Sequence, residues 1–262
     1  MIKKIYDDYF YKSHIDKDYT INFLNSLKKF NLIETTCLCK SRDDKPILNV
    51  DRCKNKFEIV ICKQCGIVRS KYYFSSKDIM EIYKSSYRDE RLKIQKNSKS
   101  LYNALSESEY IKDNWNIIEE YVNLSGSRKL NIVDIGAGGG GFLDRYKNIH
   151  NCYATDYNIK WLEHANKNNI KIIYGGIKEV LDTEKRFDLI ILNHVVEHWS
   201  DFETEILNLK KLCTLYKTKI FIEVPGIDSL KNGRREGDFR GDVVFYHYHY
   251  FTSYILVSLF EK

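Results

Sequence analysis

The sequence predicts an α/β fold in which helices cover both faces of a parallel sheet. From Leu130 onward, apolar runs of strand length alternate with amphipathic runs of helix length, which is the pattern of parallel sheets with crossover helices. The first of these strands leads directly into a glycine-rich turn, "NIVDIGAGGGGFLDRY" at residues 131–146. Before residue 76 the pattern changes to short strands and paired cysteines. A small separate module is therefore expected ahead of the α/β core.

The expected elements divide the chain into four parts. A helical segment covers residues 1–35, with its clearest helix over 21–33, and a cysteine-bearing module of short strands covers 36–75. A helical connector over 76–127 begins at a serine N-cap, Ser75 or Ser76. The core covers 128–262. Its strands are expected at 130–135, 152–155, 171–174, 187–192 and 219–224, and its helices at 141–148, 158–168, 202–213 and 253–262.

Length and composition limit the classes of protein to consider. The chain has 262 residues, which is long enough for one sizeable core and a satellite module. Its net charge is +6. No apolar run reaches 18 residues, so no membrane span is expected. The first residues lack the apolar stretch of a signal peptide. A cytoplasmic location is expected, in which the seven cysteines are thiols or metal ligands.

The glycine-rich turn fits two cofactors. Gly136, Gly138 and Gly141 have the G-x-G-x-x-G spacing of dinucleotide-binding turns. Asp156 follows Gly136 by 20 residues, where a carboxylate can accept hydrogen bonds from ribose hydroxyls. These residues alone are compatible with NAD. A turn that binds nothing is a third reading, although five glycines in six positions exceed what a tight turn needs.

Asp134 distinguishes between the two cofactors. It lies at the carboxyl end of the first core strand, beside the turn. A diphosphate at that place needs amide donors and a helix N-terminus, and a fixed carboxylate repels it. S-adenosylmethionine carries a sulfonium and an ammonium group and no phosphate, so the carboxylate attracts it. Asp134 with Gly136, Gly138 and Gly140 at alternate positions therefore favours S-adenosylmethionine.

Two cysteine pairs predict a structural zinc site. Cys37-x-Cys39 and Cys62-x2-Cys65 are separated by 22 residues, and two such pairs can surround one tetrahedral zinc. The sequence is also compatible with unmetallated buried thiols or with a redox pair in "CKQC". Cys53 is a spare ligand that could replace Cys39. Cys152 and Cys213, in a predicted strand and helix, are expected in the core.

The order of these motifs resembles the class I S-adenosylmethionine-dependent methyltransferases. The resemblance includes "YATDYN", "FDLIILNHVVEHWSD", "IFIEVPG" and "FYHYHYFTSYIL". It implies a Rossmann-like three-layer core, expected here without its usual last two strands. The segment "CLC … DRCKNKFEIVICKQCGIV" resembles the zinc-binding module of bacterial methyltransferases that act on sugars, often at carbon, on nucleotide-linked deoxysugars or surface polysaccharides.

Carried over by position, the resemblance implies a cofactor site. Asp134 would lie near the methionine amino group, Asp156 would hold the ribose, and Tyr157 would flank the adenine. The turn would allow close approach of the cofactor, the residues after the third strand would line the adenine edge, and those after the fourth would border the methionine. The remaining residues of this expected set are Gly136, Ala137, Gly138, Gly140, Gly176, Ile177, Asn193 and His194.

Histidine suits the removal of a proton at neutral pH. His194 and His198 are four residues apart, so a helix would place them on one face with Glu197 beside them. His247 and His249 alternate with tyrosines, so they share one face if extended. The expected catalytic residues are His247, His198 and Glu197, with His247 as the general base.

The sequence thus predicts methyl transfer from S-adenosylmethionine to a small acceptor, most specifically a sugar or nucleotide sugar. RNA is the second candidate acceptor, because the stretch from Lys40 to Lys71 contains nine basic residues and only four acidic ones. No aromatic stacking motif supports it, so nucleic acid is not favoured. An NAD-dependent sugar-nucleotide oxidoreductase and a non-catalytic cofactor-binding protein are two further classes compatible with the sequence. The sequence does not specify the methylated atom or the oligomeric state.

Overall fold

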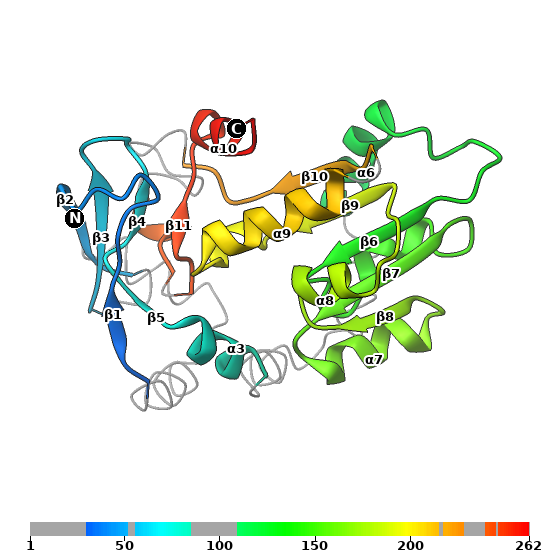
Figure 1. Ribbon diagram of the computed structural model, residues 1–262, viewed down its shortest axis with the longest axis horizontal. Helices are drawn as coiled ribbons and strands as arrows, with labels where there is room; N and C mark the ends of the chain where they lie inside the picture. The colour runs from blue at the N-terminus through cyan, green and yellow to red at the C-terminus, as the bar shows by residue number, and fades with distance from the viewer. Residues whose placement is uncertain are drawn as a thin grey trace.

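The computed structural model describes residues 30–51, 56–84, 109–214, 217–227, 239–244 and 246–261. Among these residues the largest sheet has five strands, all parallel, in the order β10-β9-β6-β7-β8 (Figure 1). This confirms the predicted α/β fold. The strands are β6 (Asn131–Ile135), β7 (Asn151–Asp156), β8 (Lys171–Tyr174), β9 (Leu189–Asn193) and β10 (Lys219–Glu223).

Neighbouring residues of each central strand enter two different cores, because successive side chains of a strand point to opposite faces. Ile132 belongs to a cluster that also contains Trp115 and Leu162, and Val133 to one that contains Leu209. The first face is thus covered by α6 (Glu109–Tyr121) and α7 (Ile159–Lys167). The second is covered by α8 (Ile177–Asp182) and α9 (Phe202–Thr214). The result is the predicted three-layer arrangement.

Strand β6 is the point at which the strand order reverses. It pairs with β7 on one side and with β9 on the other. The connection from β6 leads to β7, whereas β9 and β10 fill the opposite half of the sheet. The carboxyl ends of all five strands lie at the same edge because the pairing is parallel. Ligands of open α/β sheets bind in the crevice beside such a switch point.

The predicted helix at 141–148 is wrong in type. A 3-10 helix, η1 (Gly141–Arg145), follows the glycine turn, and turns lead from it to β7. The connection has to return along the length of β6, about 17 Å at ~3.3 Å per residue. A 3-10 helix advances ~2.0 Å per residue against ~1.5 Å for an α-helix. The tighter helix therefore covers this distance with fewer residues.

The cysteine-bearing part forms a second, antiparallel sheet, with the order β11-β4-β3-β2. Its strands are β2 (Asp44–Val50), β3 (Lys56–Cys62), β4 (Val68–Ser70) and β11 (His249–Tyr250). A two-stranded ribbon pairs β1 (Leu32–Glu34) with β5 (Tyr72–Phe74). The helix predicted over 21–33 lies mostly outside the described residues. Its last two residues form β1 instead, because pairing with β5 satisfies their backbone.

Two further helices follow these sheets. α3 (Ser76–Lys84) begins after Ser75, whose Oγ accepts a hydrogen bond of 3.1 Å from the amide of Asp78. α10 (Ser253–Phe260) begins after Thr252, whose Oγ1 accepts one of 3.2 Å from the amide of Ile255. Between β10 and α10 lies β11, which pairs with β4 of the second sheet and not with the parallel sheet (Figure 1). No sequence pattern indicated this return to the cysteine-bearing sheet.

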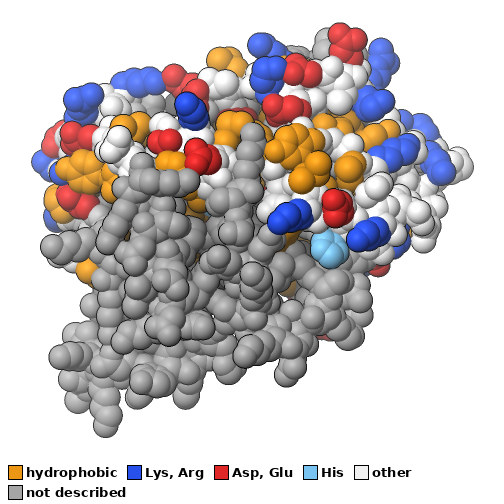
Figure 2. All heavy atoms as spheres, turned by 90° about the horizontal axis from the view of Figure 1, so that it is seen from below, with side chains coloured by type: hydrophobic (Ala, Val, Ile, Leu, Met, Phe, Trp, Pro, Cys, Tyr) orange, Lys and Arg blue, Asp and Glu red, His pale blue; other side chains and the backbone are white. Residues whose placement is uncertain are grey.

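The surface carries charges of both signs. Figure 2 shows one face on which basic, acidic and hydrophobic side chains are interspersed among the described residues. Part of the basic excess predicted between residues 40 and 71 is paired with acids: Lys63 lies 2.7 Å from Asp43, and Lys71 lies 3.1 Å from Glu58. Within the described part of the chain, no helix has the length and apolar character needed to cross a membrane.

Candidate active site

The glycine turn is built from residues in left-handed conformations. Gly136, Gly138 and Gly140 have φ angles of 72°, 57° and 80°, which residues with a side chain rarely adopt. A Cβ on Gly136 would lie 2.7 Å from a methyl of Val195, and one on Gly140 would lie 2.7 Å from Cβ of Ala165. Gly141 instead begins η1 with no positive φ angle. The conformation thus follows the alternate glycines rather than the dinucleotide spacing.

Two buried carboxylates flank this turn. Asp134 and Asp156 are 3% and 7% exposed. Asp156 accepts hydrogen bonds from the amides of Gly138, at 3.0 Å, and Asn158, at 2.8 Å. Burial, and then the charge of Asp156, raise the pKa of Asp134 well above its usual value. A cationic group placed here would offset both effects.

The carboxyl end of β8 approaches the residue after Asp156. A Cβ on Gly176 would lie 2.6 Å from the Tyr157 hydroxyl, so these two predicted adenine-edge residues are neighbours. The amide of Gly176 donates to Glu179 at 2.7 Å. The Ile177 side chain, however, is 2% exposed and packs in the core between the sheet and α9. Ile177 therefore has almost no accessible surface.

On the other side of the switch point, α6 reaches the ends of β9 and β10. The Tyr110 hydroxyl donates to Asn193 Oδ1 at 2.8 Å and also bonds to Glu223. Asn114 Nδ2 donates to Glu223 at 2.9 Å. Tyr110 and Asn114 thus contact the candidate site, which the sequence did not indicate because polar residues on an amphipathic helix usually face solvent.

His194 has a left-handed backbone with a φ angle of 54°. Such a conformation in a residue with a side chain costs roughly 1 kcal/mol and concentrates at functional sites. Its amide donates to the carbonyl of Glu223 at 2.9 Å, which holds the turn after β9 against β10. The turn continues into the short 3-10 helix η2 (Val196–His198).

The three predicted catalytic residues come together around one carboxylate. Glu197 is 1% exposed. Its Oε1 lies 3.2 Å from His194 Nδ1, 3.7 Å from His198 Nε2 and 3.9 Å from His247 Nε2. Its other oxygen has no hydrogen-bond partner among the described residues. One buried carboxylate oxygen is therefore surrounded by three imidazoles, one of which comes from a segment 50 residues away.

The hydrogen bonds of His198 fix its tautomer. Its Nδ1 lies 2.8 Å from the carbonyl oxygen of Tyr246, which can only accept, so Nδ1 carries a proton. The Tyr83 hydroxyl lies 2.9 Å from the same nitrogen. In the neutral ring Nε2 is then the basic nitrogen, and it faces Glu197. Tyr83 belongs to α3, and no sequence pattern linked that helix to this turn.

The continuous extended strand on which His247 and His249 would share one face is not formed. β11 begins only at His249, and a turn precedes it. His249 is 0% exposed and packs against Phe202 and Phe251, with ring centroids 5.5 and 5.6 Å away. Burial, and then the charge of Arg69, lower the pKa of His249 to about 3. It is a neutral core residue, whereas His247 belongs to the Glu197 cluster.

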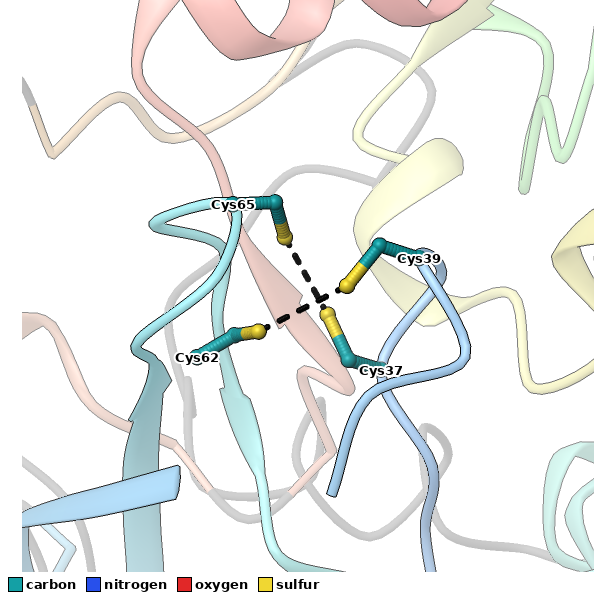
Figure 3. A group of neighbouring side chains, drawn as sticks. All are labelled: Cys37, Cys39, Cys62 and Cys65. Carbon is teal, nitrogen blue, oxygen red and sulfur yellow. Dashed lines mark hydrogen bonds between the residues drawn. The ribbon is translucent and has the colours of Figure 1, made fainter. Parts of the chain in front are cut away.

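The four predicted zinc ligands converge on one point (Figure 3). The Sγ atoms of Cys37 and Cys65 are 3.3 Å apart, and those of Cys39 and Cys62 are 3.6 Å apart. All four lie within 4.8 Å of one another. Tetrahedral zinc at ~2.3 Å from each sulfur requires sulfurs about 3.8 Å apart, so the set fits the ion. Cys53 lies outside the described residues.

The surroundings of the cysteines favour a thiolate at Cys62 but not at Cys37 or Cys65. Burial raises the pKa of Cys62, but hydrogen bonds from the amides of Cys65 and Gln64, and then from the thiols of Cys39 and Cys37, lower this pKa to about 7. Burial instead raises the pKa values of Cys37 and Cys65, so a bound cation would be needed to hold them as thiolates. The turns after Cys39 and Cys65 each contain a left-handed residue, Lys40 and Gly66, with φ angles of 68° and 78°. Of the remaining cysteines, Cys152 is buried in β7 and Cys213 is half-buried in α9.

The parallel sheet, with a turn of left-handed glycines at its switch point, places this chain among the open α/β proteins, in which ligands bind at that point. A family model described as "Methyltransferase domain" matches residues 93–262, which is more than half of the chain. The chain therefore belongs to the methyltransferase-domain family. The match covers the glycine turn, the Glu197 cluster and α10, and begins after the four cysteines.

Individual relatives match over shorter stretches. The ubiquinone biosynthesis O-methyltransferase of Pelagibacter ubique is 33% identical over 112 residues, 39% of this chain and 46% of that protein. The protein of the same name from Rickettsia akari is 35% identical over 94 residues, 32% and 36% of the two chains. The chain thus spans less than half the length of these relatives. Among solved structures, the 1,6-didemethyltoxoflavin-N1-methyltransferase of Burkholderia thailandensis is 18% identical in sequence, with a TM-score of 0.49. The match covers 83% of this chain and 86% of that one.

Replacing Asp134 by Asn tests the cost of its buried charge. The pKa of Asp134 is raised above its ordinary value of 3.8 in the folded chain. The folded state therefore binds more protons, and the wild-type free energy of unfolding falls as pH rises from 3.8 through the folded pKa. We expect Asp134→Asn to raise Tm near neutral pH and to lose this advantage in acid. Thermal melts across pH check this, with exposed Asp113→Asn as control; equal pH dependence in variant and wild type would contradict it.

Proposed function

We propose that this protein transfers the methyl group of S-adenosylmethionine to a small-molecule acceptor. The observation that carries the proposal is the pair of buried carboxylates, Asp134 and Asp156, beside a turn of left-handed glycines. Two desolvated carboxylates repel a diphosphate and attract a sulfonium or an ammonium group. Membership of the methyltransferase-domain family agrees with this choice over NAD.

The proposed cofactor site follows the carboxyl edge of the sheet. The Asp134 carboxylate would attract the methionine ammonium, and Asp156 would accept hydrogen bonds from the ribose hydroxyls. Gly136, Ala137, Gly138 and Gly140 would let the cofactor approach the backbone. Tyr157 would flank the adenine, with the backbone of Gly176 and Ile177 at its edge, and Asn193 and His194 would border the methionine. These four regions lie at the ends of β6, β7, β8 and β9.

For the chemistry, the Glu197 cluster would supply the base. S-adenosylmethionine supplies an electrophilic methyl group on a positively charged sulfur. As an acceptor atom bonds to the methyl carbon, the carbon–sulfur bond breaks and its electron pair stays on sulfur. The acceptor proton passes to an imidazole, for which His247 is our first choice and Nε2 of His198 our second. The buried Glu197 carboxylate would stabilise either imidazolium through charge attraction.

For the acceptor, we propose a sugar or nucleotide sugar of a surface-polysaccharide or related pathway. The support is the resemblance of the four-cysteine segment to that of sugar methyltransferases, together with the convergence of the four sulfurs. Relatives named for ubiquinone biosynthesis favour a small molecule without favouring a sugar. RNA is the runner-up, and it predicts binding that weakens steeply with salt. A non-catalytic cofactor-binding protein predicts binding with no turnover.

Calorimetric titration tests the cofactor. We expect S-adenosylmethionine and S-adenosylhomocysteine to bind with Kd values of about 1–100 μM, or ~5–8 kcal/mol, and NAD not to bind. Asp156→Ala should weaken binding by at least about tenfold, because the ribose hydroxyls lose their acceptor. Asp182→Ala, at an exposed carboxylate paired with Lys178, is the matched control. Binding of NAD alone would contradict the assignment.

Release of S-adenosylhomocysteine with a panel of nucleotide sugars tests the base. We expect His247→Ala to lower kcat by about 10²–10⁴-fold, the usual contribution of a general base, while the Kd of S-adenosylmethionine changes by less than about threefold. His164→Ala, on α7 away from the cluster, is the control. If only His198→Ala has this effect, His198 is the base. Full turnover in both variants would exclude His247 and His198 as the base.

Metal analysis tests the zinc site. The purified chain should contain one zinc ion, bound by Cys37, Cys39, Cys62 and Cys65. Cys62→Ser should release it, because three thiolates and a weakly acidic hydroxyl bind zinc less well than four thiolates. Cys152→Ser, at a buried thiol in β7, should keep the ion. Zinc content that is unaffected by Cys62→Ser would show that the metal is bound elsewhere.

A further inference from the structure

Three consecutive carbonyl groups beside the candidate base are held by the cysteine-bearing part of the chain. The Tyr73 hydroxyl donates to the carbonyl of Tyr246 at 2.7 Å. The Ser70 hydroxyl donates to the carbonyl of His247 at 2.9 Å, and the Ser70 amide donates to that of Tyr248 at 2.9 Å. We call residues 246–251 the histidine segment. Its backbone position is set by β4 and β5.

Packing reinforces these bonds. His249 and Tyr250 pair with Arg69 and Val68 in the antiparallel β11–β4 ladder. The rings of Tyr73 and Tyr248 stack, with centroids 4.7 Å apart and planes 7° from parallel. A strand of two residues makes too few ladder bonds to be stable alone. The histidine segment therefore depends on β4 and β5 for its conformation.

The opposite side of the same segment contacts the candidate catalytic turn. The amide of Tyr248 donates to the carbonyl of Glu197 at 2.8 Å. His198 Nδ1 donates to the carbonyl of Tyr246 at 2.8 Å. The histidine segment, which contains β11 of the second sheet, thus lies between β4 and η2. A shift of β4 would move His247 and would also alter the bonds of Glu197 and His198.

The four cysteines fix the start of β4. Cys62 is the last residue of β3, and Cys65 precedes the first residue of β4 by three positions. The turn between them is closed by a 2.9 Å hydrogen bond from the Gly66 amide to the Cys62 carbonyl. Ile255 of α10 packs against Cys37, Cys62 and Ile67. The cluster thus restrains both β4 and the helix that follows the histidine segment.

We propose that the four-cysteine module acts in catalysis by positioning His247, with Ser70 as the positioning residue. This inference rests on the proposed function, because it presumes that His247 acts in methyl transfer. Ser70 is 0% exposed, and its contacts to the histidine segment are made to backbone carbonyls. It acts through His247. Groups that hold a catalytic side chain within a fraction of an ångström can decide its efficiency without contacting substrate.

Ser70→Ala tests this role with the loss of one hydroxyl. Hydrogen–deuterium exchange should become about tenfold faster at the amides of residues 246–251, which is the effect expected for one lost hydrogen bond. In histidine NMR, the pH titration of His247 should shift, because its distance to Glu197 changes. Ser70→Thr, which keeps the hydroxyl, should stay within about twofold of the wild-type exchange rate.

Thr218→Val is the matched control. The Thr218 hydroxyl also donates to a backbone carbonyl, that of Phe187, at 2.8 Å, but at the opposite edge of the parallel sheet from the site. It should leave both the exchange of residues 246–251 and the His247 titration unchanged. A role of Ser70 in general stability alone predicts equal effects of Ser70→Ala and Thr218→Val on these readouts, and that result would overturn the proposal.

A Cys62→Ser/Cys65→Ser variant tests the cysteine cluster itself. We expect faster exchange at residues 246–251 and unchanged exchange at residues 151–174, in β7, α7 and β8. Unchanged exchange at residues 246–251 would refute the coupling. Calorimetry with S-adenosylmethionine on the same samples separates the two proposals. No binding by the wild-type chain would refute the proposed function, whereas the exchange data would still decide whether the module positions the histidine segment.

Discussion

The structure depends on the parallel pairing of β6 with both β7 and β9. Each of these pairings places the carboxyl ends of two strands at the same edge. The glycine turn after β6, Asp156 at the end of β7 and Asn193 at the end of β9 become neighbours for that reason alone. The reversal of strand order at β6 places the ligand crevice of such sheets beside this turn. Both the candidate cofactor site and the Glu197 turn are built on this one edge.

The buried carboxylates at that edge destabilise the folded chain. Asp134 is buried, and the charge of Asp156 beside it has the same sign, so the pKa of Asp134 is raised. The hydrogen bonds of Asp156 to backbone amides compensate only one member of the pair. Such arrangements are retained where a ligand of opposite charge completes them. A sulfonium ligand satisfies this condition, and a diphosphate does not.

The histidine segment connects the cysteine-bearing strands to the turn that follows β9 of the parallel sheet. On one side it accepts hydrogen bonds from Ser70 and Tyr73, and on the other it bonds to Glu197 and His198. α3 adds the Tyr83 hydroxyl to the same cluster. A module built around four cysteines can therefore influence the Glu197 cluster without contributing a cysteine to it. This gives a physical reason for a small cysteine-rich sheet beside an α/β core.

The sequence by itself determined the parallel sheet, the glycine turn and the four-cysteine set, because each depends on periodicity or on spacing between near neighbours. The alternation of strand and helix from Leu130 required only local patterns, and the alternate glycines required only the backbone angles of a single turn. Tertiary structure alone decided the rest. It placed Tyr83, Tyr110 and Asn114 in the site, because no spacing in the sequence connects α3 or α6 with the ends of β9 and β10. It also gave the two buried histidines different neighbours, since His247 lies near Glu197 whereas His249 packs against Phe202 and Phe251. Contacts between residues 177 positions apart, such as Ser70 and His247, arise because β11 returns to pair with β4 in the second sheet. No periodicity in the sequence indicates such a pairing.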